Sequence, residues 1–241
     1  MIDFNMTVAG CNITVKCRHE LCRDYCSAYI NNDSAFEAQI NSFVGDAELR
    51  KTLETVEDIT EDYAEFTGLY RPLADFLPTA EGFVIHGASI SYDSKAYLFT
   101  APSGTGKSTH IRLWKRFLGE GVGIVNGDKP IVTARNGDIL IHGTPWAGKE
   151  RWQRNVSLPL EAICILTRGE KNSVREASAD EFLPFLLKQT YLNNDPCHTA
   201  LTLELLDKVL KKVKVYILAC NISEEAVKTS FEALTGKSYP R

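Results

Sequence analysis

In the first 80 residues, apolar positions recur with the period of a β-strand in some segments and with the period of an α-helix in others. Alternation with period two indicates strands, and Gly10 offers a turn that would divide the first strand region in two. Apolar residues recur every three or four positions from Ile59 to Leu77, which indicates one face of a helix that Pro72 should kink or divide. The predicted elements are one or two strands at Met6–Lys16, a short helix at Glu20–Ile30, a strand at Ala35–Val44 and a helical region at Thr55–Phe76.

The pattern after residue 81 is that of a mixed α/β core. Asn136-Gly137 predicts a hairpin turn, and Ser178 with Glu181 forms a capping box for a helix that Pro184 should interrupt. The predicted strands are two segments in residues 82–101 joined by a turn at Asp93-Ser94, then Gly123–Asn126, Ile131–Ala134, Ile139–Ile141, Leu160–Leu166 and Val213–Cys220. The predicted helices are Thr109–Leu118, the one after Ser178, Leu201–Lys211 and Ser223–Leu234.

These patterns predict an α/β protein in two parts. Residues 1–80 form a small α+β part, a candidate for substrate or partner recognition, and residues 81–241 form a core with a mixed sheet. No linker rich in Pro, Gly or Ser separates the parts, so they should pack together.

Composition and charge narrow the classes of function. The chain of 241 residues has a net charge of −4, which disfavours nucleic acid as a partner because such proteins usually carry a basic excess. No apolar run approaches the roughly 18–20 residues that span a bilayer, so no membrane association is expected. The N-terminal residues lack the basic start and apolar stretch of a signal peptide, which predicts a cytoplasmic protein.

Seven cysteines include a group of four near the N-terminus: Cys11, Cys17, Cys22 and Cys26. They are separated by five, four and three residues, so the group contains no C-x-x-C pair and fits no common zinc module, even with His19 as a further ligand. This favours reduced structural thiols, and a metal site stays open as the alternative.

The loop at residues 101–109 carries the strongest chemical signal. It has the sequence Ala-Pro-Ser-Gly-Thr-Gly-Lys-Ser-Thr, which is the motif G-x-x-x-x-G-K-[ST] with Ala101 at the first glycine position. Glycines permit backbone angles that turn successive N–H groups inward, and the following helix adds its positive end. The predicted ATP contacts are Ser103, Gly104, Thr105, Gly106, Lys107, Ser108 and Thr109, with Lys107 on the β- and γ-phosphates and the Ser108 hydroxyl on Mg²⁺.

An acid for the magnesium ion follows on the next predicted strand. Val125-Asn126-Gly127-Asp128 begins with apolar character and ends in a carboxylate, twenty residues after Ser108. Asp128 is therefore the candidate metal-linked carboxylate and a candidate base for the acceptor hydroxyl. The alternative is an ordinary Gly-Asp turn.

Two further features are candidates for the site. His86 precedes the loop in an apolar strand, where a core position is the alternative to a catalytic one. The segment 142–152 combines glycines, a proline, two tryptophans and cations, and its Trp146, Lys149 and Arg151 are candidate substrate contacts that could hold phosphate or an acidic group. The alternative for this segment is a packed loop with surface cations.

These residues resemble the catalytic domain of HPr kinase/phosphorylase, whose fold is shared with the ATP-dependent phosphoenolpyruvate carboxykinases. The resemblance rests on His86-Gly87, the β structure that follows, the Ser-Gly-Thr-Gly-Lys-Ser loop and the later acid, and it extends over about residues 82–192. It implies a P-loop core in which Asp128 matches one acid of the family's Asp-Asp pair and His86 a histidine near the transferred phosphate. Gly127 stands at the position of the first Asp, so the chain resembles a divergent member and the general base stays open.

The leading hypothesis is therefore an ATP- and Mg²⁺-dependent phosphotransferase. Its acceptor would be a hydroxyl on a small molecule, a peptide or a protein. The missing second acid motivates an alternative, an ATP-binding regulatory or scaffold module without phosphoryl transfer. Carboxykinase-like chemistry on a small acid is a third hypothesis, for which the chain is short. A homo-oligomer is left open.

Overall fold

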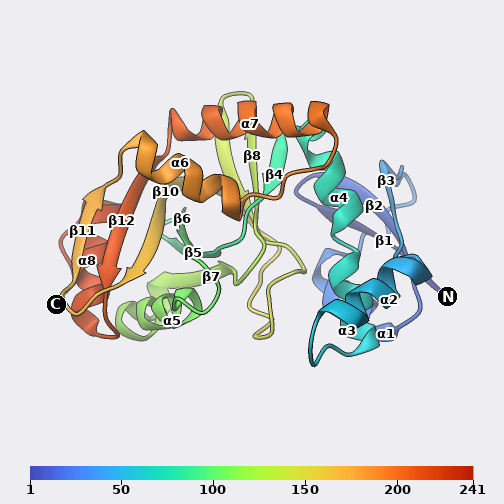
Figure 1. The fold of residues 1–241 in the computed structure, drawn as a ribbon, viewed down its shortest axis with the longest axis horizontal. Coiled ribbons are helices and arrows are strands. Elements are labelled where there is room, and N and C mark those ends of the chain that lie inside the picture. The colour runs from blue at the N-terminus through green and yellow to red at the C-terminus, as the bar shows by residue number, and fades with distance from the viewer. Residues whose placement is uncertain (241) are drawn as a thin grey trace.

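The computed structural model describes residues 1–240 and has a mixed α/β fold with two β-sheets (Figure 1). A three-stranded sheet lies in the N-terminal part, and a nine-stranded mixed sheet is the centre of the remaining part, the core. Within the described residues, no helix is long and apolar enough to cross a membrane.

The N-terminal part combines the small sheet with four short helices. Its strands are β1 (Ile2–Val8), β2 (Cys11–Cys17) and β3 (Ile40–Ser42), and its helices are α1 (Glu20–Cys26), α2 (Asp46–Thr55), α3 (Glu61–Gly68) and α4 (Arg71–Phe76), with 3₁₀ turns at Ser27–Tyr29 and Leu77–Ala80. The division of the first strand region at Gly10 is confirmed, since β1 and β2 form an antiparallel hairpin. Within the predicted strand Ala35–Val44, only the three residues of β3 form a strand. The predicted helical region Thr55–Phe76 contains two helices, α3 and α4. The sequence pattern did not predict α2, because Leu49 is its only buried residue and one apolar position gives no helical period.

Nine strands and four longer helices make up the core. The strands are β4 (Gly82–Val84), β5 (Ala88–Tyr92), β6 (Lys95–Thr100), β7 (Val122–Asn126), β8 (Ile131–Arg135), β9 (Asp138–His142), β10 (Ser157–Arg168), β11 (Ser173–Glu176) and β12 (Lys214–Cys220). The helices are α5 (Lys107–Leu118), α6 (Ala179–Gln189), α7 (Pro196–Leu210) and α8 (Glu224–Thr235), with a 3₁₀ turn at Gly119–Gly121. The long strand β10 organises the sheet: it runs parallel to β6 and β12 and antiparallel to β9.

Side-chain alternation on β6 explains why helices cover both faces of this sheet. Leu98 faces the apolar cluster formed with α6 and α7, whereas Tyr97 and Phe99 face the cluster formed with α5 and α8. Successive residues of a strand point to opposite faces, so a strand that is apolar at nearly every position is buried on both sides. The apolar sequence before the loop is the local cause of this arrangement.

The core differs from the sequence-based prediction in several details, including β11, which was not predicted, and the start of α7 at Pro196 instead of Leu201. Residues 82–101 form three strands, because the chain leaves the sheet at residues 85–87: β4 pairs with β8, whereas β5 pairs with β6 and β7. Pro184 does not interrupt α6, which continues from Ala179 to Gln189. A proline in a helix removes the hydrogen bond to the carbonyl four residues earlier, and at this exposed site that carbonyl, on Asp180, is accessible to water.

The N-terminal part and the core share one apolar cluster. Val84, Ile131 and Trp146 of the core pack in the same cluster as the buried residues of β1, β2, α1 and α3. Figure 1 shows α7 running along the top of the core as far as α4, and α7 contacts the 3₁₀ turn at Leu77–Ala80. The two parts therefore hold a fixed position relative to each other.

The N-terminal cysteines are free thiols within this cluster. Cys11, Cys17, Cys22 and Cys26 are buried, and burial is the main cause that raises the pKa of each thiol. Among residues 1–240, no group of three or more His, Cys, Asp or Glu side chains is arranged to hold a metal ion. These thiols act here as small apolar core residues.

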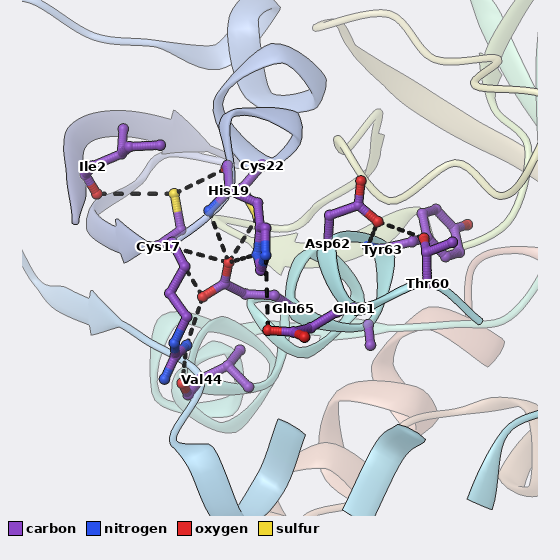
Figure 2. Close-up of polar contacts among 12 residues, drawn as sticks. Ile2, Cys17, His19, Cys22, Val44, Thr60, Glu61, Asp62, Tyr63 and Glu65 are labelled. Atoms are coloured by element: carbon purple, nitrogen blue, oxygen red, sulfur yellow. Dashed lines mark hydrogen bonds and ion pairs between the residues drawn. The ribbon is translucent and has the colours of Figure 1, made fainter. Parts of the chain in front are cut away.

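Glu65 of α3 is a fully buried carboxylate that joins α3 to the end of β2 (Figure 2). It accepts hydrogen bonds from the backbone N–H groups of Arg18 and His19, from the Arg18 guanidinium at 2.7 Å and from His19 Nδ1 at 2.8 Å. Burial alone would raise the pKa of Glu65, but these donors outweigh it and the pKa is lowered. The carboxylate therefore stays charged and fixes the position of α3.

Replacing Glu65 by glutamine is expected to destabilise the protein by about 2–3 kcal/mol, because it leaves the Arg18 guanidinium with an incomplete set of acceptors. The folded-state pKa is depressed, so the stabilisation is present above the unfolded carboxyl pKa and is lost as the pH falls through the folded one. Denaturant unfolding at pH 7 and pH 4 measures both effects. Asp46→Asn is the control, since this exposed partner of Arg18 should contribute at most about 1 kcal/mol. Equal losses for the two variants would contradict the account.

Candidate active site

The 101–109 loop connects the end of β6 directly to the start of α5. Gly104 and Gly106 have φ angles of +75° and +123°, which other residues rarely adopt. A Cβ atom built on either glycine would meet no neighbour within 4 Å, so the backbone angle rather than crowding requires glycine there. The helix begins at Lys107, two residues earlier than the sequence pattern indicated, so its first N–H groups, which have no partner within the helix, lie at the end of the loop.

Lys107 bends back over this loop. Its Nζ donates a 2.9 Å hydrogen bond to the carbonyl of Ala101, and only 8% of the residue is exposed. Burial lowers the pKa of Lys107, and the negative charge of Asp128 acts in the opposite direction. A buried cation therefore lies at the loop and shares the wall of one cavity with Asp128, a place where an anion would be strongly favoured.

Arg168 holds the loop from the other side. From the end of β10 it donates to the carbonyl oxygens of Gly104 at 2.6 Å and Thr105 at 3.4 Å. These two hydrogen bonds fix the backbone of the loop at Gly104 and Thr105. The sequence gives no local signal for this contact, because it joins residues more than 60 positions apart.

Asp128 follows β7 in a tight turn that Asn126 builds. The Asn126 side-chain oxygen accepts hydrogen bonds from the backbone N–H groups of Asp128 at 2.9 Å and Lys129 at 2.8 Å. Its amide nitrogen donates to Thr144, which anchors the turn to the 142–152 segment. Asn126 is completely buried, so the turn is rigid.

Each oxygen of the Asp128 carboxylate lies close to a basic side chain. Oδ1 lies 3.4 Å from His86 Nε2, and Oδ2 is paired with the Lys129 ammonium. Burial alone would raise the pKa of Asp128, but His86 and Lys129 outweigh burial and hold the pKa well below its usual range. Asp128 is therefore a carboxylate at any physiological pH.

His86 is held beside Asp128 by its backbone and by its ring. The segment 85–87 leaves the sheet and runs along the Asp128 turn, where Gly87 N donates to the carbonyl of Asp128 at 2.9 Å. The ring Nδ1 lies 2.9 Å from Oε1 of Gln189, the last residue of α6. Gln189 was not a sequence candidate, since nothing in the pattern of α6 predicts that its end meets His86.

These groups line one cavity of about 470 Å³. Its wall consists of Tyr63, His86, Ser103, Gly104, Gly106, Lys107, Ser108, Thr109, Gly127, Asp128, Gly148, Lys149 and Glu150. A second cavity of about 770 Å³ lies across the loop and shares Gly104, Gly106 and Thr109 with the first. Most of the predicted site residues thus meet in one place, and Thr105 lines the second cavity.

The three predicted substrate contacts have different positions. Lys149 lines the 470 Å³ cavity, and its ammonium has no ion pair among the described residues. Trp146 does not line that cavity: it is buried in the core, stacked on Phe66, with its indole N–H bonded to the Phe66 carbonyl at 3.0 Å. Arg151 lies outside the cavity over the ring of Tyr25. Trp146 and Arg151 thus contact residues of the N-terminal part, and a contact of either with substrate stays a prediction.

Gly127 is a glycine because the 142–152 segment passes very close to it. A Cβ atom at this position would lie 2.7 Å from the carbonyl oxygen of Ala147. An aspartate at this position would require the 145–148 backbone to move. The chain therefore has one carboxylate in this turn for a steric reason.

Gly127→Ala is expected to lower the free energy of unfolding by about 1–3 kcal/mol, the usual cost of forcing extra atoms into a packed site. Thermal unfolding measures it. Gly45→Ala is the matched control: its Cβ has free space, and only a helix-cap preference is lost, which costs below about 1 kcal/mol. A Gly127 variant as stable as the wild type would show that the turn can open.

Comparisons with known proteins give matches only among solved structures. No model of a known family and no protein of curated function matches this sequence. Among solved structures, the Hpr(Ser) kinase/phosphatase from Coxiella burnetii is similar to this chain with 14% sequence identity and a TM-score of 0.35, over 64% of this chain and 93% of that one. This indicates only a distant structural relationship, and a TM-score this low does not establish a common fold.

Proposed function

We propose that the protein binds ATP at the 101–109 loop and transfers the γ-phosphate to a hydroxyl acceptor. The single observation that supports this most is the convergence of Lys107, the glycines of the loop, Asp128 and His86 on one cavity. An anion nest with a buried cation suits a triphosphate, and a carboxylate–histidine pair suits proton transfer from a hydroxyl. We also propose that residues 81–241 form a P-loop core of the HPr kinase type.

The loop and Lys107 would hold the β- and γ-phosphates. Ser108 and Asp128 both present oxygen atoms to the cavity, and oxygen is the donor that Mg²⁺ prefers, so the residues fit a magnesium ion that enters with ATP. Such an ion supplies neutralisation of the phosphate charge. Lys107 would stabilise the charge that develops on the transferring group.

His86 would take the proton of the acceptor hydroxyl. If Nδ1–H donates to Oε1 of Gln189, Nε2 of the neutral ring would carry the lone pair that takes the proton, and Nε2 would donate to Asp128 only in the imidazolium form. The acceptor oxygen forms a bond to the γ-phosphorus, the bond to the bridging oxygen of ADP breaks, and the proton moves to His86. Asp128 would stabilise the imidazolium that results.

The 770 Å³ cavity would receive the nucleoside. It lies directly across the shared glycines and is lined in part by apolar side chains, among them Leu113, Leu166 and Ile222. Apolar walls with a few polar groups are typical of sites that bind a flat, uncharged ring. Lys149, on the other side of the loop, would orient an anionic group of the acceptor.

One observation favours the alternative of an ATP-binding module without phosphoryl transfer. Both oxygens of the single carboxylate, Asp128, already have partners in His86 and Lys129. If these pairs persist with nucleotide bound, Asp128 serves neither magnesium nor proton transfer. The two functions differ in whether a phosphorylated product forms.

The test is incubation of the purified protein with γ-labelled ATP and Mg²⁺ against a panel of free amino acids, sugars, peptides and proteins. The proposed function predicts label on an acceptor, and none with Asp128→Asn. Tight magnesium-dependent ATP binding without transfer to any member would favour the regulatory module. Transfer that is equal in the variant would contradict the assigned site.

A further inference from the structure

Tyr63 brings the N-terminal part into the candidate site. It lies on α3, and it lines the 470 Å³ cavity together with His86, Lys107 and Asp128, although it is far from them in sequence. Tyr63 and Asp128 also line a smaller cavity, together with Phe66, Thr67, Tyr70, Lys129, Trp146 and Gly148, so Tyr63 shares both cavities with Asp128. Burial raises the pKa of Tyr63, and the charge of Asp128 raises it further, so the phenol keeps its proton.

The position of Tyr63 is fixed by both faces of α3. Residues two apart on a helix point in nearly opposite directions, and Figure 2 shows Glu65 in its buried network on one side of α3 and Tyr63 on the other. On the core side, the Phe66 carbonyl accepts the hydrogen bond of the Trp146 indole. The helix that carries Tyr63 is therefore anchored both to β2 and to the core.

Tyr63 lies on the side of the loop from which the acceptor would approach. The nucleoside cavity lies across Gly104 and Gly106, whereas Tyr63, His86, Asp128 and Lys149 lie on the other side of the loop. In-line transfer requires the acceptor oxygen to approach the γ-phosphate from the side opposite to ADP. Tyr63 forms part of the cavity wall on that side.

We propose that Tyr63 contacts the acceptor and determines its specificity, so that the N-terminal part of this chain selects which hydroxyl compound is phosphorylated. This rests on the proposed function. The phenol offers a flat apolar face and one hydroxyl that can donate and accept, which suits a small hydroxyl-bearing molecule whose anionic group lies at Lys149. A bulky acceptor would first have to displace α3, which two sets of buried contacts hold.

The experiment uses thiol labelling in the full chain. Tyr63→Cys is made with Cys197→Ser and Cys220→Ser, which removes the two native thiols that are not buried. The rate of labelling by a maleimide is measured by mass spectrometry without nucleotide, with MgADP, and with MgADP plus aluminium fluoride as the mimic of the transferring phosphoryl group. Glu61→Cys, exposed on the same helix and two residues away, is the matched control.

Labelling of the Tyr63→Cys variant should fall at least tenfold with MgADP and aluminium fluoride, and much less with MgADP alone, while labelling of the Glu61→Cys variant stays constant. Calorimetry on the same variants reports nucleotide binding separately. Binding without selective protection of the thiol at position 63 would overturn this inference and leave the proposed function standing. Absence of binding in the wild type would overturn both. If Tyr63→Cys does not fold, nitration of Tyr63 in the wild-type protein by tetranitromethane gives the same comparison.

Discussion

Replacing Lys107 by alanine is expected to lower phosphoryl transfer by about a thousandfold or more while the protein stays folded. The ammonium is buried at the loop and shares the wall of one cavity with Asp128, where its interaction with phosphate is much stronger than in water. Removal of a single cation that stabilises the charge of a transferring phosphoryl group costs about 10³–10⁵ in rate. The measurement is the rate of label transfer from γ-labelled ATP, together with a thermal unfolding curve.

Lys115→Ala is the matched control for this prediction. Lys115 lies further along the same helix and pairs only with exposed Glu120 at 3.8 Å. Its removal should leave transfer unchanged. Full activity in Lys107→Ala, or equal losses in the two variants, would contradict the role assigned to Lys107.

Asp128→Asn is expected to lower transfer by at least about a hundredfold and to raise the magnesium concentration needed for half-maximal activity. Asparagine keeps the shape of the side chain but removes the charge that would bind Mg²⁺ and stabilise protonated His86. A magnesium titration of the initial rate measures both effects. Asp62→Asn is the control, because this carboxylate lies beside Tyr63 in sequence but outside the cavity.

The low pKa of Asp128 gives this prediction a pH dependence of definite sign. The folded-state value lies below the ordinary carboxyl value of about 3.9, so protonation of Asp128 begins only below about pH 4. Asp128 therefore contributes no loss of activity between about pH 5 and pH 8, and any acid limb in that range must belong to another group. A side-chain carboxyl signal of Asp128 that titrates between pH 5 and pH 8 in NMR spectra would contradict the assignment.

The parts of the site that depend on neighbouring residues could be predicted from the sequence. The order of strand, glycine-rich loop and helix is local, because the apolar run of β6, the two glycines and the amphipathic start of α5 follow one another directly. The strand that ends just before Asp128 was predicted for the same reason, whereas the Gly-Asp turn was only the alternative reading of these residues. In each case a short run of consecutive residues determines the local conformation of the backbone.

The contacts that join distant segments could not be predicted in this way. Gln189 reaches His86 because α6 ends against the chain at residues 85–87, and Arg168 reaches Gly104 because β10 lies beside β6. Trp146 was predicted as a substrate contact because it stands in a glycine-rich segment with cations, but its position depends on the packing of α3, which the pattern of residues 142–152 does not encode.

The measurement that tests the central claim most directly is calorimetric titration of MgATP into the wild-type protein and into Lys107→Ala. If the 101–109 loop holds the triphosphate, the wild type binds with a dissociation constant between about 1 µM and 1 mM, the range usual for enzyme substrates. Binding weakens at least tenfold in the variant and when magnesium is removed. No binding at millimolar MgATP, or equal affinity in Lys107→Ala, would contradict the account.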